Sequence, residues 1–278
     1  MEFFLVLMAL AVIQGVAEFL PVSSSGHLVI FEHIPLLRRN LDAIGPDMML
    51  FLNVLLHLAT LVAVIIYLRR DIAALAAGFL RALGRRDFSG PEARSVAYIL
   101  AACVPAALIG VLFHDFFERA FSSPFAASLM LIANGIMLIT TKIIPIKNRQ
   151  IEEMGIMRAL LVGCAQAVAI LPGISRSGST IAGGFLAGLE PEQAARFSFL
   201  MAIPVILGAG LLESLKLNPA VLSGGMIWAL AAASLVAIAV ALAALRILVA
   251  MVKRIRIDVF GYYTIAAGIL AALYFSFR

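Results

Sequence analysis

The sequence predicts an all-α integral membrane protein with six transmembrane helices and two re-entrant helical hairpins, arranged as an inverted-topology repeat. Hydrophobic residues fill 63% of the 278 positions and charged residues only 13%, which is more apolar surface than a soluble domain can bury. Several apolar runs also approach the roughly 20 residues that cross a hydrocarbon core. We therefore expect a single membrane domain that covers residues 1–278.

Six segments are long and apolar enough to be full membrane spans. They are expected at about residues 48–68, 94–113, 125–144, 196–215, 226–250 and 259–277. The net charge is +5, but the basic residues lie at the ends of apolar runs, as topology-setting charges do. The expected partner is therefore the bilayer and not a nucleic acid.

Two further pairs of apolar segments are interrupted by polar turns. The first pair covers residues 3–20 and 22–33 and breaks at PVSSSGH, whereas the second covers 157–171 and 173–188 and breaks at PGISRSGST. Broken backbone at membrane depth persists only where it is buried in protein or lines a wet cavity. Each pair is therefore predicted to form a re-entrant hairpin.

The basic loops predict the orientation. Loops 69–94, 142–158 and 251–258 carry most of the arginines and lysines. They share one side if the six spans alternate and both hairpins return to the side they enter from. That side is cytoplasmic by the positive-inside rule, so the first hairpin enters from outside and the second from inside.

A constant offset aligns the two interrupted segments, and each of them begins a half that three spans complete. The matched pairs are Gln14 with Gln166, Ser23 with Ser175, Ser25 with Ser177, and Gly26 with Gly178, while Ser24 falls on Arg176. The predicted repeats are about 1–144 and 145–278. An odd number of spans inverts the second copy, and such repeats place broken helices together near the midplane. We therefore expect the two polar turns to face each other.

The first turn, within QGVAEFLPVSSSGH, gathers acid–base groups. Gln14 and Glu18 are four residues apart, so they share a helix face. Ser23 or Ser24 can cap the following helix, and His27 lies about one turn into it. The turn thus brings a carboxylate, hydroxyls and an imidazole into one region.

The second turn supplies an anion receptor. An arginine at membrane depth is costly and marks a functional site, and Arg176 lies in such a place. Glycines and hydroxyl side chains at a helix start can cradle a phosphate, and the guanidinium fork suits phosphate geometry. The residues concerned are Gly173, Ser175, Ser177, Gly178, Ser179 and Thr180.

Together these groups suffice for phosphoryl transfer to water, with a serine or histidine nucleophile and an arginine clamp. If the substrate is a diphosphate, Glu18 can hold a divalent cation with Gln14 beside it. Hard oxygen ligands favour magnesium or calcium. His57 lies inside a predicted span; the sequence leaves open whether it supports the site or only joins two helices.

Three stretches carry a family resemblance. They are QGVAEFLPVSSSGH at 14–27, LPGISRSGST at 171–180, and the weaker FSFLMAIP at 197–204. In these the chain is similar to the bacterial undecaprenyl-diphosphate phosphatase family associated with bacitracin resistance. The resemblance implies a multi-pass enzyme of the bacterial inner membrane, with its active site facing the extracytoplasmic side. It also implies that the enzyme hydrolyses undecaprenyl diphosphate to undecaprenyl phosphate and inorganic phosphate, recycling the lipid carrier for peptidoglycan synthesis with a divalent cation, Mg or Ca.

The resemblance also implies residue roles. Ser24 matches the family's motif serine and is the expected nucleophile, with His27 as base or acid; His27 is the alternative nucleophile. Arg176 matches the motif arginine and holds the diphosphate, while Glu18 binds the metal or orients the histidine. This chain has Gln14 where the family has glutamate or glutamine, which leaves one carboxylate there. The expected substrate-binding residues are Ser23, Ser25, Gly173, Ser175, Ser177, Gly178, Ser179 and Thr180.

A different class of function remains open at this stage. A transporter or flippase for a polyprenyl phosphate lipid also uses inverted repeats that meet at the midplane, and Arg176 can bind a phosphate without hydrolysing it. Neither the helices that line the lipid tail nor the oligomeric state, monomer or homodimer, follows from the sequence.

The predicted orientation can be tested with single cysteines at residues 40 and 87, after Cys103 and Cys164 are replaced by alanine. In intact cells an impermeant thiol reagent should label residue 40 and leave residue 87 unlabelled until the cells are lysed. Labelling of residue 87 from outside would reverse the orientation.

Overall fold

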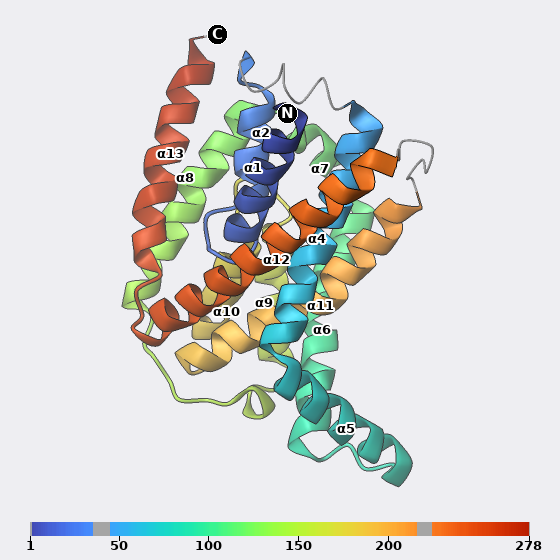
Figure 1. The fold of residues 1–278 in the computed structure, drawn as a ribbon. Helices are drawn as coiled ribbons and strands as arrows, with labels where there is room; N and C mark the ends of the chain where they lie inside the picture. The colour runs from blue at the N-terminus through green and yellow to red at the C-terminus, as the bar shows by residue number, and fades with distance from the viewer. Residues whose placement is uncertain (1, 36–44, 216–223, 278) are drawn as a thin grey trace.

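The computed structural model describes residues 2–35, 45–215 and 224–277, and within these ranges every regular element is a helix (Figure 1). Residue 40, a labelling position above, lies outside these ranges. The α-helices are α1 (Glu2–Ala17), α2 (Ser24–Glu32), α4 (Pro46–Tyr67), α5 (Arg69–Arg85), α6 (Pro91–Leu112), α7 (His114–Phe121), α8 (Pro124–Thr140), α9 (Ile156–Val168), α10 (Arg176–Leu186), α11 (Pro191–Ser214), α12 (Gly224–Lys253) and α13 (Asp258–Ser276).

Six of these helices, α4, α6, α8, α11, α12 and α13, are long and apolar enough to cross a membrane, which confirms the six predicted spans. Some ends differ by a few residues. The sequence places the start of the fourth span at about residue 196, whereas α11 begins at Pro191. The earlier start is possible because Arg196 pairs with Asp71, and because a proline suits the first turn of a helix.

The two interrupted segments form pairs of shorter helices. α1 runs inward from one end of the molecule and α2 returns toward that end, while α9 and α10 do the same from the opposite end (Figure 1). The apolar parts of α1 and α9 are shorter than a span. This arrangement is consistent with the two predicted re-entrant hairpins.

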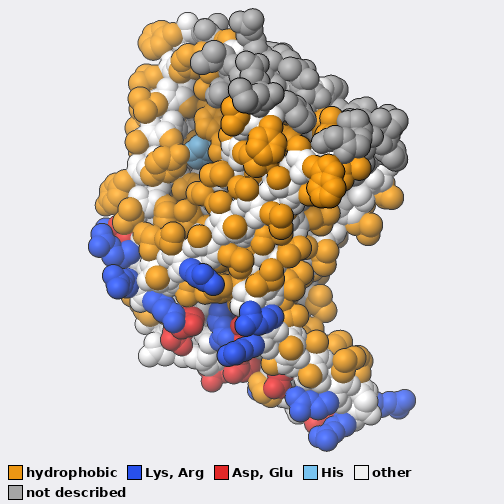
Figure 2. All heavy atoms as spheres, in the orientation of Figure 1, with side chains coloured by type: hydrophobic (Ala, Val, Ile, Leu, Met, Phe, Trp, Pro, Cys, Tyr) orange, Lys and Arg blue, Asp and Glu red, His pale blue; other side chains and the backbone are white. Residues whose placement is uncertain are grey.

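The three basic loops lie at one end of the molecule. Lysine and arginine side chains gather at the end that carries α5 (Figure 2). Lys142 forms an ion pair with Asp258 at 2.8 Å, and Lys253 with Glu192 at 2.9 Å. These pairs join segments far apart in the chain, in agreement with the shared side that the charge pattern predicts.

Close packing of α8 on α13 depends on glycine. A Cβ atom added at Gly135 would lie 2.5 Å from the carbonyl oxygen of Gly261, and one added at Gly261 would lie 2.6 Å from that of Gly135. The two backbones therefore touch, as small residues allow in membrane helices. The reciprocal contact joins the last spans of the two predicted halves and is consistent with the inverted repeat, whose boundaries remain a prediction.

Substitution of Gly261 by alanine should destabilise the protein, because its Cβ would meet backbone that cannot move aside without separating α8 from α13. Overpacking of this kind costs about 1–3 kcal/mol. The control is Gly208→Ala in α11, since no atom lies within 4 Å of the added Cβ there. Thermal unfolding in detergent should show a clear loss for the first variant only; equal melting temperatures would contradict the packing argument.

Candidate functional site

The two polar turns meet inside the protein, and each ends in a capped helix. The Oγ of Ser23 accepts a hydrogen bond from the backbone N–H of Gly26 at 3.3 Å, and Ser175 caps Gly178 in the same way at 3.2 Å. These are residues that the alignment of the two segments pairs. The Ser23 hydroxyl also donates to the carbonyl oxygen of Ile174 at 3.3 Å, which ties the first turn to the second.

Glycines let the turns approach each other. A Cβ added at Gly26 would lie 2.6 Å from the Cα of Gly173, and one added at Gly178 would lie 3.1 Å from the Cβ of Pro21. Gly173 has φ +105°, a left-handed backbone that favours glycine. In the alignment of the two segments, Gly26 pairs with Gly178 and Pro21 pairs with Gly173. The contact of Gly26 with Gly173 is therefore the counterpart of the contact of Gly178 with Pro21.

Asn134 of α8 joins the turns from a third helix. Its side chain is fully buried, donates to the carbonyl oxygen of Pro21 at 3.1 Å, and accepts from the backbone N–H of Ser175 at 2.9 Å. One amide thus satisfies a backbone group in each turn. Asn134 was not among the predicted site residues; its signal in the sequence is a lone asparagine in the middle of an apolar span.

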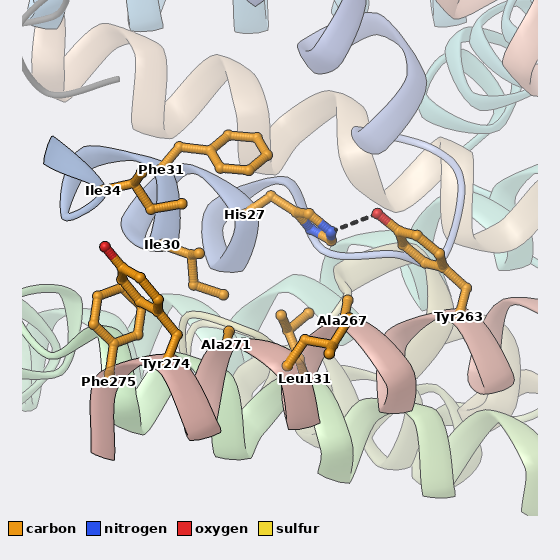
Figure 3. Close-up of a pocket in the computed structure, with 11 residues that line it drawn as sticks. His27, Ile30, Phe31, Ile34, Leu131, Tyr263, Ala267, Ala271, Tyr274 and Phe275 are labelled. Carbon is orange, nitrogen blue, oxygen red and sulfur yellow. Dashed lines mark hydrogen bonds between the residues drawn. The ribbon is translucent and has the colours of Figure 1, made fainter. Parts of the chain in front are cut away.

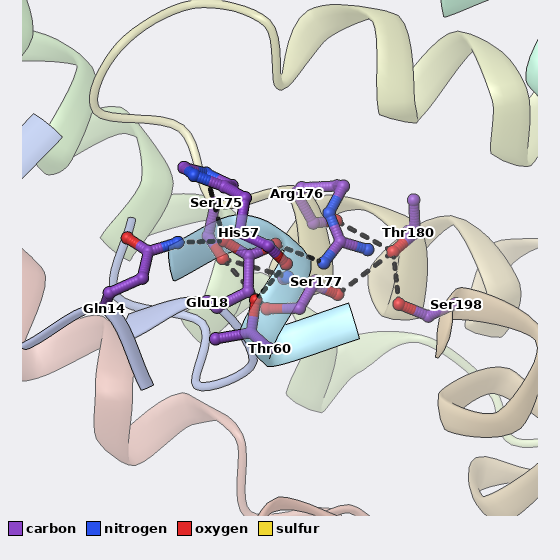
Figure 4. Close-up of polar contacts among 10 residues, drawn as sticks. Gln14, Glu18, His57, Thr60, Ser175, Arg176, Ser177, Thr180 and Ser198 are labelled. Atoms are coloured by element: carbon purple, nitrogen blue, oxygen red, sulfur yellow. Dashed lines mark hydrogen bonds and ion pairs between the residues drawn. The ribbon is translucent and has the colours of Figure 1, made fainter. Parts of the chain in front are cut away.

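Glu18, which is buried, and Arg176, which is partly buried, form an ion pair across the two turns (Figure 4). The Arg176 Nη2 lies 2.9 Å from the Glu18 Oε1, and the amide of Gln14 donates to the other carboxylate oxygen at 3.0 Å. Glu18 is only 8% exposed. The structure therefore brings together three of the residues that the sequence assigns to the site.

The second guanidinium nitrogen of Arg176 has an unfilled hydrogen bond. Its Nη1 is buried and has no acceptor within the described part of the chain. Arg176 is also the first residue of α10, and α2 begins at Ser24 in the adjoining turn. Helix N-termini carry partial positive charge, so an anionic oxygen would complete the site.

His57 of α4 lies beside this pair. Its Nδ1 donates to the carbonyl oxygen of Asn53 at 2.8 Å, and its Nε2 lies 3.6 Å from the Glu18 Oε2. The sequence left its role open, and the structure places it next to the site's carboxylate. Helix packing alone brings it there, since the first turn, α2 and the segment after α2 separate α1 from α4 in the chain.

His27 faces α13 instead. Its Nδ1 donates to the carbonyl oxygen of Ser23 at 2.8 Å, and its Nε2 is 2.9 Å from the hydroxyl of Tyr263, whose ring stacks on the imidazole (Figure 3). In the contacts of the described residues, His27 touches neither Glu18 nor Arg176. No sequence pattern singles out Tyr263, an aromatic residue within a span.

The other predicted binding residues mostly bond within the protein. The Thr180 hydroxyl lies 2.6 Å from that of Ser198 and donates to the carbonyl oxygen of Arg176 at 2.8 Å. The Ser177 and Ser175 hydroxyls are 3.1 Å apart. Ser179 is buried against Met137, whereas Ser24 and Ser25 are half-buried at the start of α2. Their part in substrate binding stays a prediction.

The donor set suits a divalent cation only together with a phosphate ligand. The described residues contain no group of three or more His, Cys, Asp or Glu that could hold a metal. Glu18 offers its carboxylate, and Gln14 uses its amide nitrogen on Glu18, while its amide oxygen accepts no hydrogen bond from the described residues. Magnesium is commonly held by one or two carboxylates plus substrate phosphates, so these residues fit that mode.

Comparison with known proteins identifies the family. The family model for bacitracin resistance protein BacA matches residues 7–270. The chain is 42% identical to the undecaprenyl-diphosphatase of Rubrobacter xylanophilus, covering 95% of this chain and 96% of the relative. It is 38% identical to that of Halothermothrix orenii over 97% of both chains, and 39% identical to that of Rhodopirellula baltica over 95% of both. These matches confirm the resemblance that the two turns carry, and the chain belongs to the BacA family of bacitracin resistance proteins.

Proposed function

We propose that the protein hydrolyses undecaprenyl diphosphate to undecaprenyl phosphate and inorganic phosphate, which recycles the lipid carrier for peptidoglycan synthesis and gives bacitracin resistance. The names of the relatives support this activity and lend no support to the lipid transporter. The observation that carries the proposal is Arg176, which is anchored to Glu18 by one nitrogen and has a second, buried nitrogen that finds no acceptor among the described residues.

In the proposed reaction Arg176 and the first backbone amides of α2 and α10 hold the terminal phosphate. The Oγ of Ser24 attacks its phosphorus, the bond to the bridging oxygen breaks, and undecaprenyl phosphate leaves. A water molecule then cleaves the phosphoserine and releases inorganic phosphate. Fixed donors aimed at the phosphate oxygens stabilise the charge of the transition state.

His27 is the proposed base. The carbonyl oxygen of Ser23 can only accept, so the neutral imidazole carries its proton on Nδ1 and its basic nitrogen is Nε2. That nitrogen accepts the Tyr263 hydroxyl in this structure. We expect Nε2 to exchange its hydrogen bond with Tyr263 for one with the hydroxyl of Ser24, which lies one turn away on α2. Nε2 then takes the proton of that hydroxyl.

Glu18 and Gln14 are the proposed protein ligands of a magnesium or calcium ion that the diphosphate also binds. When bound, the ion would neutralise phosphate charge. Glu18 also fixes the orientation of Arg176, since the two are hydrogen-bonded. The Nε2 of His57 lies 3.6 Å from the second oxygen of the same carboxylate and limits where it can turn.

The proposed location is the bacterial inner membrane, with the site facing the extracytoplasmic side. The basic end would then face the cytoplasm. A cavity beside His27 continues between α2 and α13 toward Ile34 and Phe275, away from the basic loops. This direction supports access from the extracytoplasmic half of the bilayer.

Phosphate release from undecaprenyl diphosphate by the purified protein tests the reaction. Ser24→Ala, His27→Ala and Arg176→Ala should each lower the rate about 100-fold or more, because each removes a group of the transition state. His33→Ala is the matched control, since His33 makes the same local bond, from Nδ1 to a carbonyl oxygen four residues earlier, and should keep its activity. Full activity of Arg176→Ala would contradict the proposed role of the arginine.

The cation proposal predicts opposite shifts for two substitutions. Gln14→Glu adds a second carboxylate and should lower the magnesium concentration for half-maximal activity, whereas Glu18→Gln should raise it about tenfold or more. A second readout is the magnesium-dependent rise in melting temperature with undecaprenyl phosphate bound. An unchanged magnesium midpoint in Glu18→Gln would remove Glu18 from the cation site.

A further inference from the structure

A cavity of about 310 Å³ lies between α2 and α13, next to the proposed catalytic centre. Its walls are mainly aliphatic and aromatic side chains, among them Phe31 of α2 and Ala267 and Phe275 of α13 (Figure 3). Its inner end is closed by the hydrogen-bonded pair of His27 and Tyr263. The polar groups that line the cavity are therefore His27 and Tyr263, next to the reacting centre, and the Tyr274 hydroxyl farther out.

The cavity is open to the lipid-facing surface. Leu270 lines it and is 69% exposed, and Tyr274, also in its wall, is 38% exposed. In a membrane span, exposed apolar side chains of this kind face acyl chains. A molecule can therefore pass sideways from the bilayer into the cavity without crossing water.

We propose that this cavity binds the isoprene units next to the diphosphate, so that the lipid enters between α2 and α13. The identity of the head group rests on the proposed function; the apolar subsite rests on the cavity itself. An amphiphile whose phosphate is at Ser24 needs an apolar path out of the protein, and this path begins at His27, one helical turn from Ser24.

The size of the cavity sets what it recognises. A volume of about 310 Å³ is far too small for a C55 chain, so the first units lie inside and the remainder stays in the bilayer. Selectivity is thus for the units near the head group and not for total chain length. A C15 prenyl phosphate and the C55 lipid should compete for the same place.

Neighbouring alanines on α13 allow a matched contact test. Ala267 lines the cavity, whereas Ala266 is exposed on the outer face of the helix. Single-cysteine proteins, Ala267→Cys and Ala266→Cys, are made after the free cysteines Cys103 and Cys164 are replaced by alanine. The probe is undecaprenyl phosphate or farnesyl phosphate, neither of which needs to be hydrolysed, and the readout is the rate of maleimide labelling.

Saturating undecaprenyl phosphate or farnesyl phosphate should slow labelling of Ala267→Cys about tenfold, and inorganic phosphate should not. Labelling of Ala266→Cys should be unchanged. Equal protection of both positions, protection by inorganic phosphate, or no protection at position 267 would overturn the assignment.

Kinetics separate this assignment from the proposed reaction. Ala267→Phe, which fills the cavity, should raise KM for C15 and C55 diphosphates about tenfold and leave kcat within about twofold, unlike Ala266→Phe. If wild type releases no phosphate but position 267 is protected, the reaction is wrong and the subsite stands. If release is normal and position 267 is unprotected, the subsite is wrong. If Ala267→Phe does not fold, labelling of Ala267→Cys, a smaller change, still tests whether the cavity binds the isoprene units.

Discussion

A helix that stops inside a membrane leaves backbone N–H and C=O groups without partners, and the rest of this structure depends on supplying them. Ser23 and Ser175 cap the two returning helices, and Asn134 bonds one backbone group in each turn. Because the partners of each turn lie partly in the other turn or in α8, neither hairpin can be built alone. The satisfied backbone is what fixes the two turns against each other.

The same solution produces the proposed anion site. Helix starts that face inward bring partial positive charge to one place, and Arg176 adds a full charge. Burying that charge alone would be costly, and the Glu18 carboxylate offsets the cost at 2.9 Å. Within the described residues the pair leaves one guanidinium nitrogen without an acceptor, so the arrangement that stabilises the fold also favours a phosphate ligand.

The two hairpins are alike in packing and different in chemistry. Gln14 bonds to Glu18, but the aligned positions of the second hairpin hold Gln166 and Ile170. Gln166 is 2% exposed, and no partner for its amide occurs among the described residues. The first hairpin therefore carries the carboxylate and imidazole, and the second carries the arginine. An amphiphilic substrate suits such a division, since its head would meet both turns while its chain would lie in the cavity between α2 and α13.

The sequence by itself determined the spans, the interrupted pairs and the residues that form the ion pair. Those features are local: hydropathy and turn residues decide the first two, and the cost of a charge in the membrane singles out Arg176. The tertiary structure alone decided that Asn134 joins the turns, that His57 stands beside Glu18, and that Tyr263 holds His27 on α13. These contacts join helices far apart in the chain, and the physical reason is that hydropathy fixes whether a helix spans the membrane but leaves open which of its faces meets which neighbour.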